Sequence, residues 1–257
     1  MSDPILIVKN ISKYFGGIKA LEKVSLSVPE NSIIGLIGPN GSGKTTLFNV
    51  VTGFYVPDGG EVYFKVNDDY VRIDGLNPHE VFKMGIVRTF QIPRLFPSLT
   101  VLENMLVTPI NQIGEKLINS IRFRVWNKEE EMLARKALDI LKEFGKLDIA
   151  DKRPSEISVA DVKLIETLRG LMTPARLYLL DEPLAGLDIP TAYKLLEFVK
   201  DLRARYKLTF LIVEHRIDLL LGAVDYVYVL HNGKLLSSGK PEEVMKDPRV
   251  IKAYVGE

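Results

Sequence analysis

The segment from Gly38 to Thr45 fits the pattern G-x-x-x-x-G-K-[ST], which is typical of a loop that binds phosphate. Glycines let the backbone wrap closely around a phosphate chain, so that backbone N–H groups point at the anion. We expect Lys44 to reach the outer phosphates of a nucleotide and the Thr45 hydroxyl to bind Mg²⁺. The expected nucleotide contacts are Gly38, Asn40, Gly41, Ser42, Gly43, Lys44, Thr45 and Thr46.

The acidic pair Asp181 and Glu182 is the second group that could do chemistry. It follows the apolar run at residues 177–180, so both carboxylates are expected at the end of a buried strand. We expect Asp181 to hold Mg²⁺ through water, and Glu182 to orient and deprotonate the water that attacks the γ-phosphate. An isolated acidic pair is usually solvated surface, but the phosphate motif elsewhere in the chain reverses that preference.

The apolar run at residues 33–37 predicts the strand that carries the phosphate loop. Its side chains are continuously apolar rather than alternating, which is typical of a strand covered on both faces. Residues 45–51, after the glycine-rich stretch, predict a helix. This order of strand, loop and helix favours a phosphate loop over a plain glycine-rich turn.

Strand patterns in the two ends of the chain predict two kinds of sheet. Residues 24–28 alternate with period two, and Val62 and Phe64 repeat that alternation, which predicts antiparallel strands between residues 5 and 64. From residue 177 onward strands and helices take turns, which predicts βαβ units and a parallel sheet. The elements expected there are strands at 177–180, 208–213 and 225–230, a helix at 191–202, and a two-residue hairpin turn at Asn232-Gly233.

The middle of the chain, from about residue 93 to 172, carries no convincing strand pattern. Residues 128–144 instead place an apolar stripe beside charged positions, as an amphipathic helix does. The stripe consists of Leu133, Ala137, Leu141 and Phe144. We therefore expect a helical subdomain at 93–172, inserted into a core formed by 1–92 and 173–257; ordinary packing helices within one domain are the alternative. The expected fold class is α/β, a P-loop NTPase core with a mixed, mainly parallel sheet and an N-terminal antiparallel β subdomain.

The composition excludes several kinds of protein. The chain has 257 residues of which 46% are hydrophobic, enough for a sizeable core, so disorder is excluded. Its 34 Lys and Arg against 33 Asp and Glu lack the positive excess expected of a nucleic-acid-binding protein. It has no cysteine, which excludes disulfides and thiol chemistry. No window is apolar enough for a membrane helix, and the N-terminus has no signal pattern, so we expect neither a membrane span nor export.

Several weaker signals, Tyr14, Gln91, residues 185–188 and His215, occur in an order that resembles the ATP-binding subunits of ABC transporters. The resemblance covers nearly all of the chain. It implies that Gln91 contacts Mg²⁺ and the attacking water, that His215 touches the γ-phosphate, and that Tyr14 or the adjacent Phe15 stacks on adenine. It also implies that residues 185–188 cross a dimer interface, with Asp188 as the polar contact. The implied catalytic residues are Lys44, Gln91, Glu182 and His215, and the implied Mg²⁺ ligands are Thr45, Gln91 and Asp181.

One motif departs from the family pattern. Members usually carry Leu-Ser-Gly-Gly-Gln before a helix, and this signature caps the γ-phosphate of ATP bound to the opposite subunit. The aligned stretch here keeps Ser158 but has Val159, Ala160 and Asp161. A β-branched Val159 should crowd the phosphate, and Asp161 offsets the positive end of the helix. Alternatively Ser158 and Asp161 cap their own helix, and the pattern is compatible with both interpretations.

The altered signature leads to a hypothesis about hydrolysis. We expect the chain to bind ATP through its own phosphate loop but to serve poorly as the capping partner of a second copy. A homodimer would then hydrolyse ATP slowly. Pairing with a different ATPase subunit that has an intact signature would restore one good site.

Four stretches narrow the resemblance to the ATPases of branched-chain amino acid importers. They are residues 85–91, 95–104, 126–131 and 247–257. The implied function is an ATPase that energises uptake of branched-chain amino acids, with urea, amide or lipid transport as alternatives. The implied partners are a second ABC ATPase subunit and transmembrane subunits. Pro93, Leu95 and Phe96 are candidates for the docking contact, and burial of these residues against the core is the alternative. The implied location is the cytoplasmic face of the cell membrane.

Three rival functions are compatible with a phosphate loop. An ABC ATPase acting on nucleic acid usually carries a coiled-coil insertion, a tandem cassette or a basic arm, and none is seen here. A small-molecule kinase would not need Gln91, the acidic pair and His215 in this order. A regulatory cassette that binds ATP without hydrolysis is encouraged by the altered signature, but Lys44, Glu182 and His215 argue against it.

Overall fold

The first sheet of the protein is antiparallel and formed by the N-terminal strands, as predicted. The computed structural model describes residues 3–110 and 123–255. Four strands hydrogen-bond in the order β2-β1-β4-β5, and each neighbouring pair is antiparallel. The strands are β1 (Pro4–Phe15), β2 (Ile18–Pro29), β4 (Gly59–Val66) and β5 (Asp69–Arg72).

The second sheet is mixed and mainly parallel, which confirms the predicted fold class. Its six strands have the order β10-β9-β3-β8-β7-β6, and only β10 runs antiparallel to its neighbour. Every residue of β3, β7 and β8 is buried, as expected for strands covered on both faces. The strands are β3 (Ile33–Ile37), β6 (Ile86–Arg88), β7 (Leu177–Asp181), β8 (Thr209–Val213), β9 (Tyr226–His231) and β10 (Lys234–Gly239).

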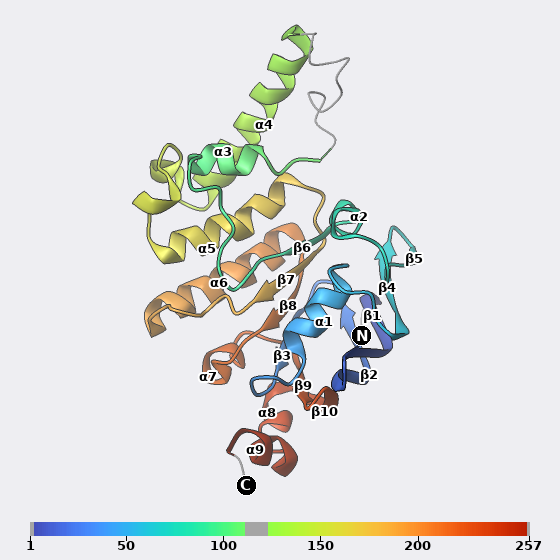
Figure 1. Cartoon of the computed structure of the whole chain (residues 1–257). Helices are drawn as coiled ribbons and strands as arrows, with labels where there is room; N and C mark the ends of the chain where they lie inside the picture. The colour runs from blue at the N-terminus through green and yellow to red at the C-terminus, as the bar shows by residue number, and fades with distance from the viewer. Residues whose placement is uncertain (1–2, 111–122, 256–257) are drawn as a thin grey trace. The chain divides into compact units, whose positions relative to one another are not determined.

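Helices connect the parallel strands, as the βαβ pattern predicts (Figure 1). The helix after β3 follows the glycine-rich loop, and the long helix after β7 begins at a capping aspartate, Asp188. The helices of this part of the chain are α1 (Lys44–Val51), α2 (Pro78–Lys83), α6 (Ile189–Tyr206), α7 (Ile217–Leu220), α8 (Pro241–Val244) and α9 (Pro248–Val255).

One hydrophobic core joins both sheets to α1. Buried side chains of the antiparallel sheet, such as Leu6 and Phe64, belong to the same cluster as Leu36 of β3 and Phe48 of α1. Interiors pack as densely as organic crystals, so a helix embedded in this way has little freedom to shift. The core therefore fixes the two elements that flank the glycine-rich loop.

The predicted hairpin joins β9 to β10 at Asn232 and Gly233. Both residues have left-handed backbone angles, with φ of 48° and 74°. This is the conformation of a type I′ turn, for which Asn-Gly is the preferred pair. The strands it joins pair antiparallel, with His231 opposite Lys234.

The chain divides into two compact units, which we call the core unit (residues 1–91 and 176–257) and the helical unit (residues 92–175). Within the described residues, the helical unit contains helices and no strand. Its amphipathic helix buries Ala137 and Leu141 of the predicted stripe, and Leu133 and Phe144 are half-buried. The helices are α3 (Val101–Leu106), α4 (Phe123–Glu143) and α5 (Val159–Leu168), with 3₁₀ turns η2 (Leu147–Ile149), η3 (Pro154–Glu156) and η4 (Arg169–Met172).

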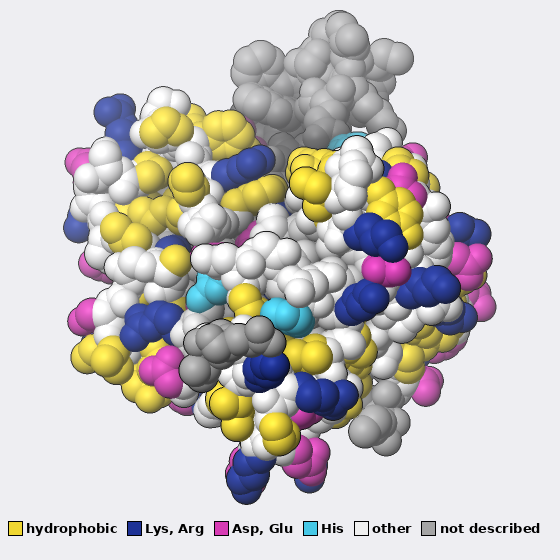
Figure 2. Space-filling view, turned by 60° about the horizontal axis from the view of Figure 1, so that its bottom comes forward, with side chains coloured by type: hydrophobic (Ala, Val, Ile, Leu, Met, Phe, Trp, Pro, Cys, Tyr) yellow, Lys and Arg dark blue, Asp and Glu magenta, His cyan; other side chains and the backbone are white. Residues whose placement is uncertain are grey.

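Two further features of the described residues are the character of their helices and the distribution of their surface charge. None of the helices in the described part of the chain combines the length and the apolar character that a membrane crossing requires. On the face drawn in Figure 2, basic and acidic side chains are interspersed, and the basic ones form no continuous field.

Candidate active site

The glycine-rich loop between β3 and α1 has a backbone that only glycine allows. Gly38 and Gly43 have φ of +155° and +105°. A Cβ at Gly43 would lie 2.6 Å from the carbonyl oxygen of Ala20, and one at Gly38 would collide with the carbonyl oxygen of Leu230. The loop is therefore a tight cradle of main chain, with no room for larger residues at its two ends.

Helix α1 begins at the end of this cradle without a capping side chain. Gly43 is the residue before the helix, no side chain accepts a hydrogen bond from the first turn, and that turn contains no acidic residue. The first N–H groups of a helix lack partners within the helix and carry partial positive charge. The start of α1 is thus suited to bind an anion.

Lys44 lies within the cradle. Only 5% of its surface is exposed, and its Nζ donates hydrogen bonds to the carbonyl oxygens of Gly38 at 2.7 Å and Pro39 at 3.0 Å. Burial lowers the pKa of Lys44, and the nearby charges of Glu182 and Asp181 oppose that decrease. The loop and the acidic pair, which lie about 140 residues apart in the sequence, are thus close in space.

Glu182 leaves strand β7 with an unusual backbone conformation. Its φ is +51°, which is left-handed and costs a residue other than glycine about 1 kcal/mol. Its backbone N–H still donates to the carbonyl oxygen of Val213, at 2.9 Å. The turn therefore redirects the side chain at the end of the strand, away from the alternation that the sheet would impose.

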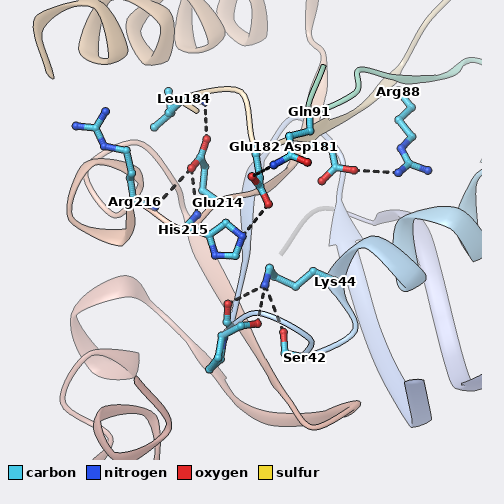
Figure 3. Close-up of polar contacts among 12 residues, drawn as sticks. Ser42, Lys44, Arg88, Gln91, Asp181, Glu182, Leu184, Glu214, His215 and Arg216 are labelled. Carbon is cyan, nitrogen blue, oxygen red and sulfur yellow. Dashed lines mark hydrogen bonds and ion pairs between the residues drawn. The ribbon is translucent and has the colours of Figure 1, made fainter. Parts of the chain in front are cut away.

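Both carboxylate oxygens of Glu182 have polar partners (Figure 3). Gln91 Nε2 donates to one oxygen at 2.7 Å, and His215 Nε2 lies 2.7 Å from the other. These partners come from separate segments, one after β6 and one after β8. The structure therefore brings Gln91, Glu182 and His215 together, and holds the carboxylate in one orientation.

A cavity of about 410 Å³ is lined by Glu182 and His215 together with the phosphate cradle. That volume lies in the range of small-molecule sites, about 300–1,000 Å³. Its lining includes the predicted nucleotide contacts from Asn40 to Thr46, together with Glu182 and His215, but neither Gly38 nor Tyr14. The lining residues are Ile18, Lys19, Ala20, Asn40, Gly41, Ser42, Gly43, Lys44, Thr45, Thr46, Glu182, His215 and Asn232.

Asp181 forms a buried ion pair with Arg88, which the sequence analysis did not single out. Arg88 Nη2 lies 2.9 Å from Asp181 Oδ2, and both side chains are 6% exposed. The other end of the guanidinium donates to Asn49 of α1 at 2.6 Å and to Thr52 at 3.2 Å. Three aromatic rings, those of Phe48, Phe54 and Phe90, lie within 5.0 to 5.8 Å of it. The one feature of the sequence that could have pointed to Arg88 is its place three positions before Gln91.

Tyr14 lies in the antiparallel sheet and outside the cavity lining. Its backbone N–H donates to Asp58 Oδ2 at 2.6 Å, and its side chain is 41% exposed. The adjacent Phe15 packs edge-on against Tyr55. Residues 18–20 of the next strand do line the cavity. Stacking of Tyr14 on adenine therefore stays a prediction.

The altered signature begins helix α5 of the helical unit. Ser158 Oγ accepts a hydrogen bond from the Asp161 N–H at 3.1 Å and donates to the Asp161 carboxylate at 2.6 Å, so Ser158 caps the helix. Lys146 Nζ contacts the same carboxylate at 2.6 Å. Burial works to raise the pKa of Asp161, but the bonds from Lys146 and Ser158 outweigh it and hold that pKa below its ordinary value. Val159 is 60% exposed.

Asp188 caps helix α6. Its Oδ1 accepts a hydrogen bond from the N–H of Thr191 at 3.2 Å. The hydrogen bond with the Thr191 side chain lowers the pKa of the Asp188 carboxyl most, and this backbone bond lowers it further. The residue is exposed, so a second protein can reach it. A contact across a dimer interface stays a prediction.

Two family models match the chain. One, described as "ABC transporter", matches residues 21–185. The other, described as "Branched-chain amino acid ATP-binding cassette transporter", matches residues 234–257, whose last two residues lie outside the described part of the structure. A relative from Archaeoglobus fulgidus, "Probable branched-chain amino acid transport ATP-binding protein LivG", is 44% identical over 98% of this chain and 95% of its own.

The solved structures that resemble this chain are also ATP-binding cassettes. An ATP-binding cassette of an ABC transporter in its ADP conformation has a TM-score of 0.84 and 40% identity, with all of both chains covered. A dimeric cassette in a post-hydrolysis state, bound to ADP and phosphate, has a TM-score of 0.72 and 25% identity, covering 92% of this chain and 98% of its own. The fold described above is therefore that of these cassettes.

Proposed function

This chain belongs to the ABC transporter family, and on that premise we propose that it is the ATP-hydrolysing subunit of a transporter that imports branched-chain amino acids. The observation that carries the enzymatic part is the Glu182 carboxylate, held by Gln91 and His215 at a cavity built from the glycine-rich loop. Such an arrangement combines a site for phosphates with an oriented base, which is what hydrolysis of a triphosphate requires.

Different residues of the site bind the phosphates, accept the proton and position the base. The N–H groups of the cradle and of the start of α1, with the Lys44 ammonium, bind and orient the phosphates. Glu182 accepts the proton of the attacking water. Gln91 and His215 hold Glu182 in place before the nucleotide arrives. His215 lines the same cavity as the loop, and the proposal assigns it the contact with the γ-phosphate.

The donors present fit Mg²⁺, which the proposal assigns to Thr45, Asp181 and Gln91. These residues offer hydroxyl, carboxylate and amide oxygens, the ligand atoms that Mg²⁺ prefers. Phosphate oxygens would supply further ligands. When bound, Mg²⁺ neutralises charge on the phosphates.

The proposed cargo is supported by the relatives and by the match at the end of the chain. The Archaeoglobus fulgidus relative is named as a branched-chain amino acid transport protein, and its similarity extends over 98% of this chain. The model that matches residues 234–257 carries the same cargo in its description. Urea, amide or lipid transport is the alternative, because an ATPase subunit does not contact the cargo.

The proposed partners are transmembrane subunits and a second ABC ATPase subunit, with the chain peripheral on the cytoplasmic face of the membrane. The dimeric relative bound to ADP and phosphate supports pairing of two cassettes. Ile92 and Phe96 expose 80% and 52% of their surfaces, which supports a docking surface near Pro93 and Leu95 in the helical unit. Nucleic acid is not among the proposed partners.

The experiment that tests this function is reconstitution of the chain with its transmembrane subunits in proteoliposomes. Uptake of radiolabelled leucine, isoleucine and valine is measured with ATP inside or outside, and the Glu182→Gln variant is the control. We expect ATP-dependent uptake that the variant lacks. Uptake of urea, an amide or a lipid instead would refute the cargo. ATP hydrolysis by the assembled transporter that is unchanged in the Glu182→Gln variant would refute the enzymatic role of this chain.

A further inference from the structure

Glu214 is a buried carboxylate beside the active site, and it has no assigned role in the reaction. It follows strand β8 and directly precedes His215. Only 2% of its surface is exposed. Burial raises the pKa of its carboxyl group, while hydrogen bonds from backbone N–H groups oppose that rise. A buried carboxylate is costly unless it is hydrogen-bonded, so its partners indicate what it does.

The partners of Glu214 are backbone groups of two different loops. One carboxylate oxygen accepts from the Leu184 N–H at 2.5 Å, in the loop after the acidic pair. The other accepts from the His215 N–H at 3.1 Å and, at the limit of 3.5 Å, from the Arg216 N–H. Figure 3 shows the carboxylate between these two segments. Charged acceptors make the stronger class of hydrogen bond.

Arg216, on the other side of His215, holds the same loop. Its Nη1 donates to the carbonyl oxygen of Leu187 at 2.7 Å. The loop between Glu182 and Asp188 is thus attached at Leu184 by the residue before His215 and at Leu187 by the residue after it. His215 itself contacts Glu182, where that loop begins.

We propose that Glu214 is a positioning residue for ATP hydrolysis, which joins the His215 backbone to the loop at 183–188 so that His215 Nε2 keeps the Glu182 carboxylate in its hydrolytic orientation. This inference rests on the proposed function of Glu182. The loop at 183–188 ends at Asp188, and its movement is transmitted to His215 through the bonds of Glu214 and Arg216.

The backbone N–H groups of Leu184, His215 and Arg216 require a side chain with two accepting oxygens, as a carboxylate has. Glutamine has the same shape, but only one of its two terminal atoms accepts hydrogen bonds. In Glu214→Gln the amide nitrogen must therefore face N–H donors of one loop or the other. The substitution keeps the volume and removes one of the two attachments, so it tests the link between the loops.

The test is a double-mutant cycle between Glu214→Gln and His215→Ala in the assembled transporter. Phosphate release from radiolabelled ATP is followed, so that slow variants remain measurable. We expect Glu214→Gln to lower kcat about 10-fold and to change KM for ATP less than about 2-fold. In the His215→Ala background we expect the same substitution to lower kcat less than about 2-fold, because a residue that acts through His215 has nothing left to position.

The matched control is Glu80→Gln. Glu80 also accepts a hydrogen bond from a backbone N–H, that of Asn77 at 2.9 Å, but it is exposed and caps helix α2. We expect its kcat to equal that of the wild type. Equal, multiplicative losses from Glu214→Gln in both backgrounds overturn the inference. Absence of ATP hydrolysis by the wild-type transporter instead overturns the proposed function, so the two failures are distinguishable.

Affinity for a fluorescent ATP analogue and chemical denaturation are measured on the full-length chain in parallel. We expect Glu214→Gln to keep wild-type affinity, since the phosphate cradle does not include residue 214. If this variant does not fold, Arg216→Gln tests the second attachment of the same loop beside His215, because it removes the bond to Leu187. A fall in kcat that disappears in the His215→Ala background supports the inference. No fall, or a fall that persists there, overturns it.

Discussion

Replacing Arg88 by methionine is expected to lower the free energy of unfolding of the nucleotide-free chain by about 3–5 kcal/mol. The ion pair with Asp181 is 2.9 Å long and each side chain is 6% exposed, so the substitution leaves a carboxylate buried without its charged partner. The hydrogen bonds to Asn49 and Thr52 are lost with it. Methionine contacts the surrounding aromatic rings well, and this returns only part of the loss.

The assay is urea denaturation with two comparisons. In Lys200→Met a surface ion pair with Glu197 of 2.8 Å is removed from side chains that are 39% and 68% exposed, and we expect a loss below about 1 kcal/mol. Adding Asp181→Asn to Arg88→Met should recover stability, since it removes the stranded charge. A loss below about 1 kcal/mol in Arg88→Met, or no recovery in the double variant, would refute the argument that the buried charge dominates.

Three further outcomes are expected. Glu182→Gln should lower kcat for ATP by about 10²–10⁴-fold and trap a nucleotide-bound dimer with the proper partner subunit, as measured by size-exclusion chromatography; a monomer alone would contradict this. The triple variant Val159→Gly, Ala160→Gly, Asp161→Gln should hydrolyse ATP faster than the wild type as a homodimer, and equal rates would show that the altered signature is no obstacle. Because the pKa of Asp161 is lowered in the folded state, the stability that wild type holds over Asp161→Asn should be full above about pH 4 and vanish as the pH falls through that lowered pKa; a difference independent of pH would contradict this.

The parts of the fold that depend on local patterns were predictable. The strand, loop and helix around Lys44, and the Asn232-Gly233 turn, are encoded by residues next to one another in the sequence. Strand β6 was not predicted as such, because three residues carry no periodicity. The order of strands in the sheet was also beyond the sequence, since parallel pairing joins segments far apart in the chain.

The groups that support the site escaped prediction for a related reason. Arg88 and Asp181 lie 93 positions apart, and the residues next to each of them give no sign that the two side chains form an ion pair. In the sequence Glu214 looks like an ordinary polar residue at the end of a strand. Its hydrogen-bond partner, the N–H group of Leu184, lies 30 positions away, so nothing near Glu214 in the sequence indicates this contact. The capping role of Ser158 could be predicted, since Asp161 stands three residues away. Hydrogen bonds of short sequence separation leave a motif, and long-range ones do not.

The uncapped start of helix α1 links the stability of the folded chain to nucleotide binding. A helix that lacks its own cap is completed only by what binds there, so occupancy by nucleotide adds directly to resistance against unfolding and proteolysis. At concentrations 100 times the dissociation constant this gain is about 2.7 kcal/mol.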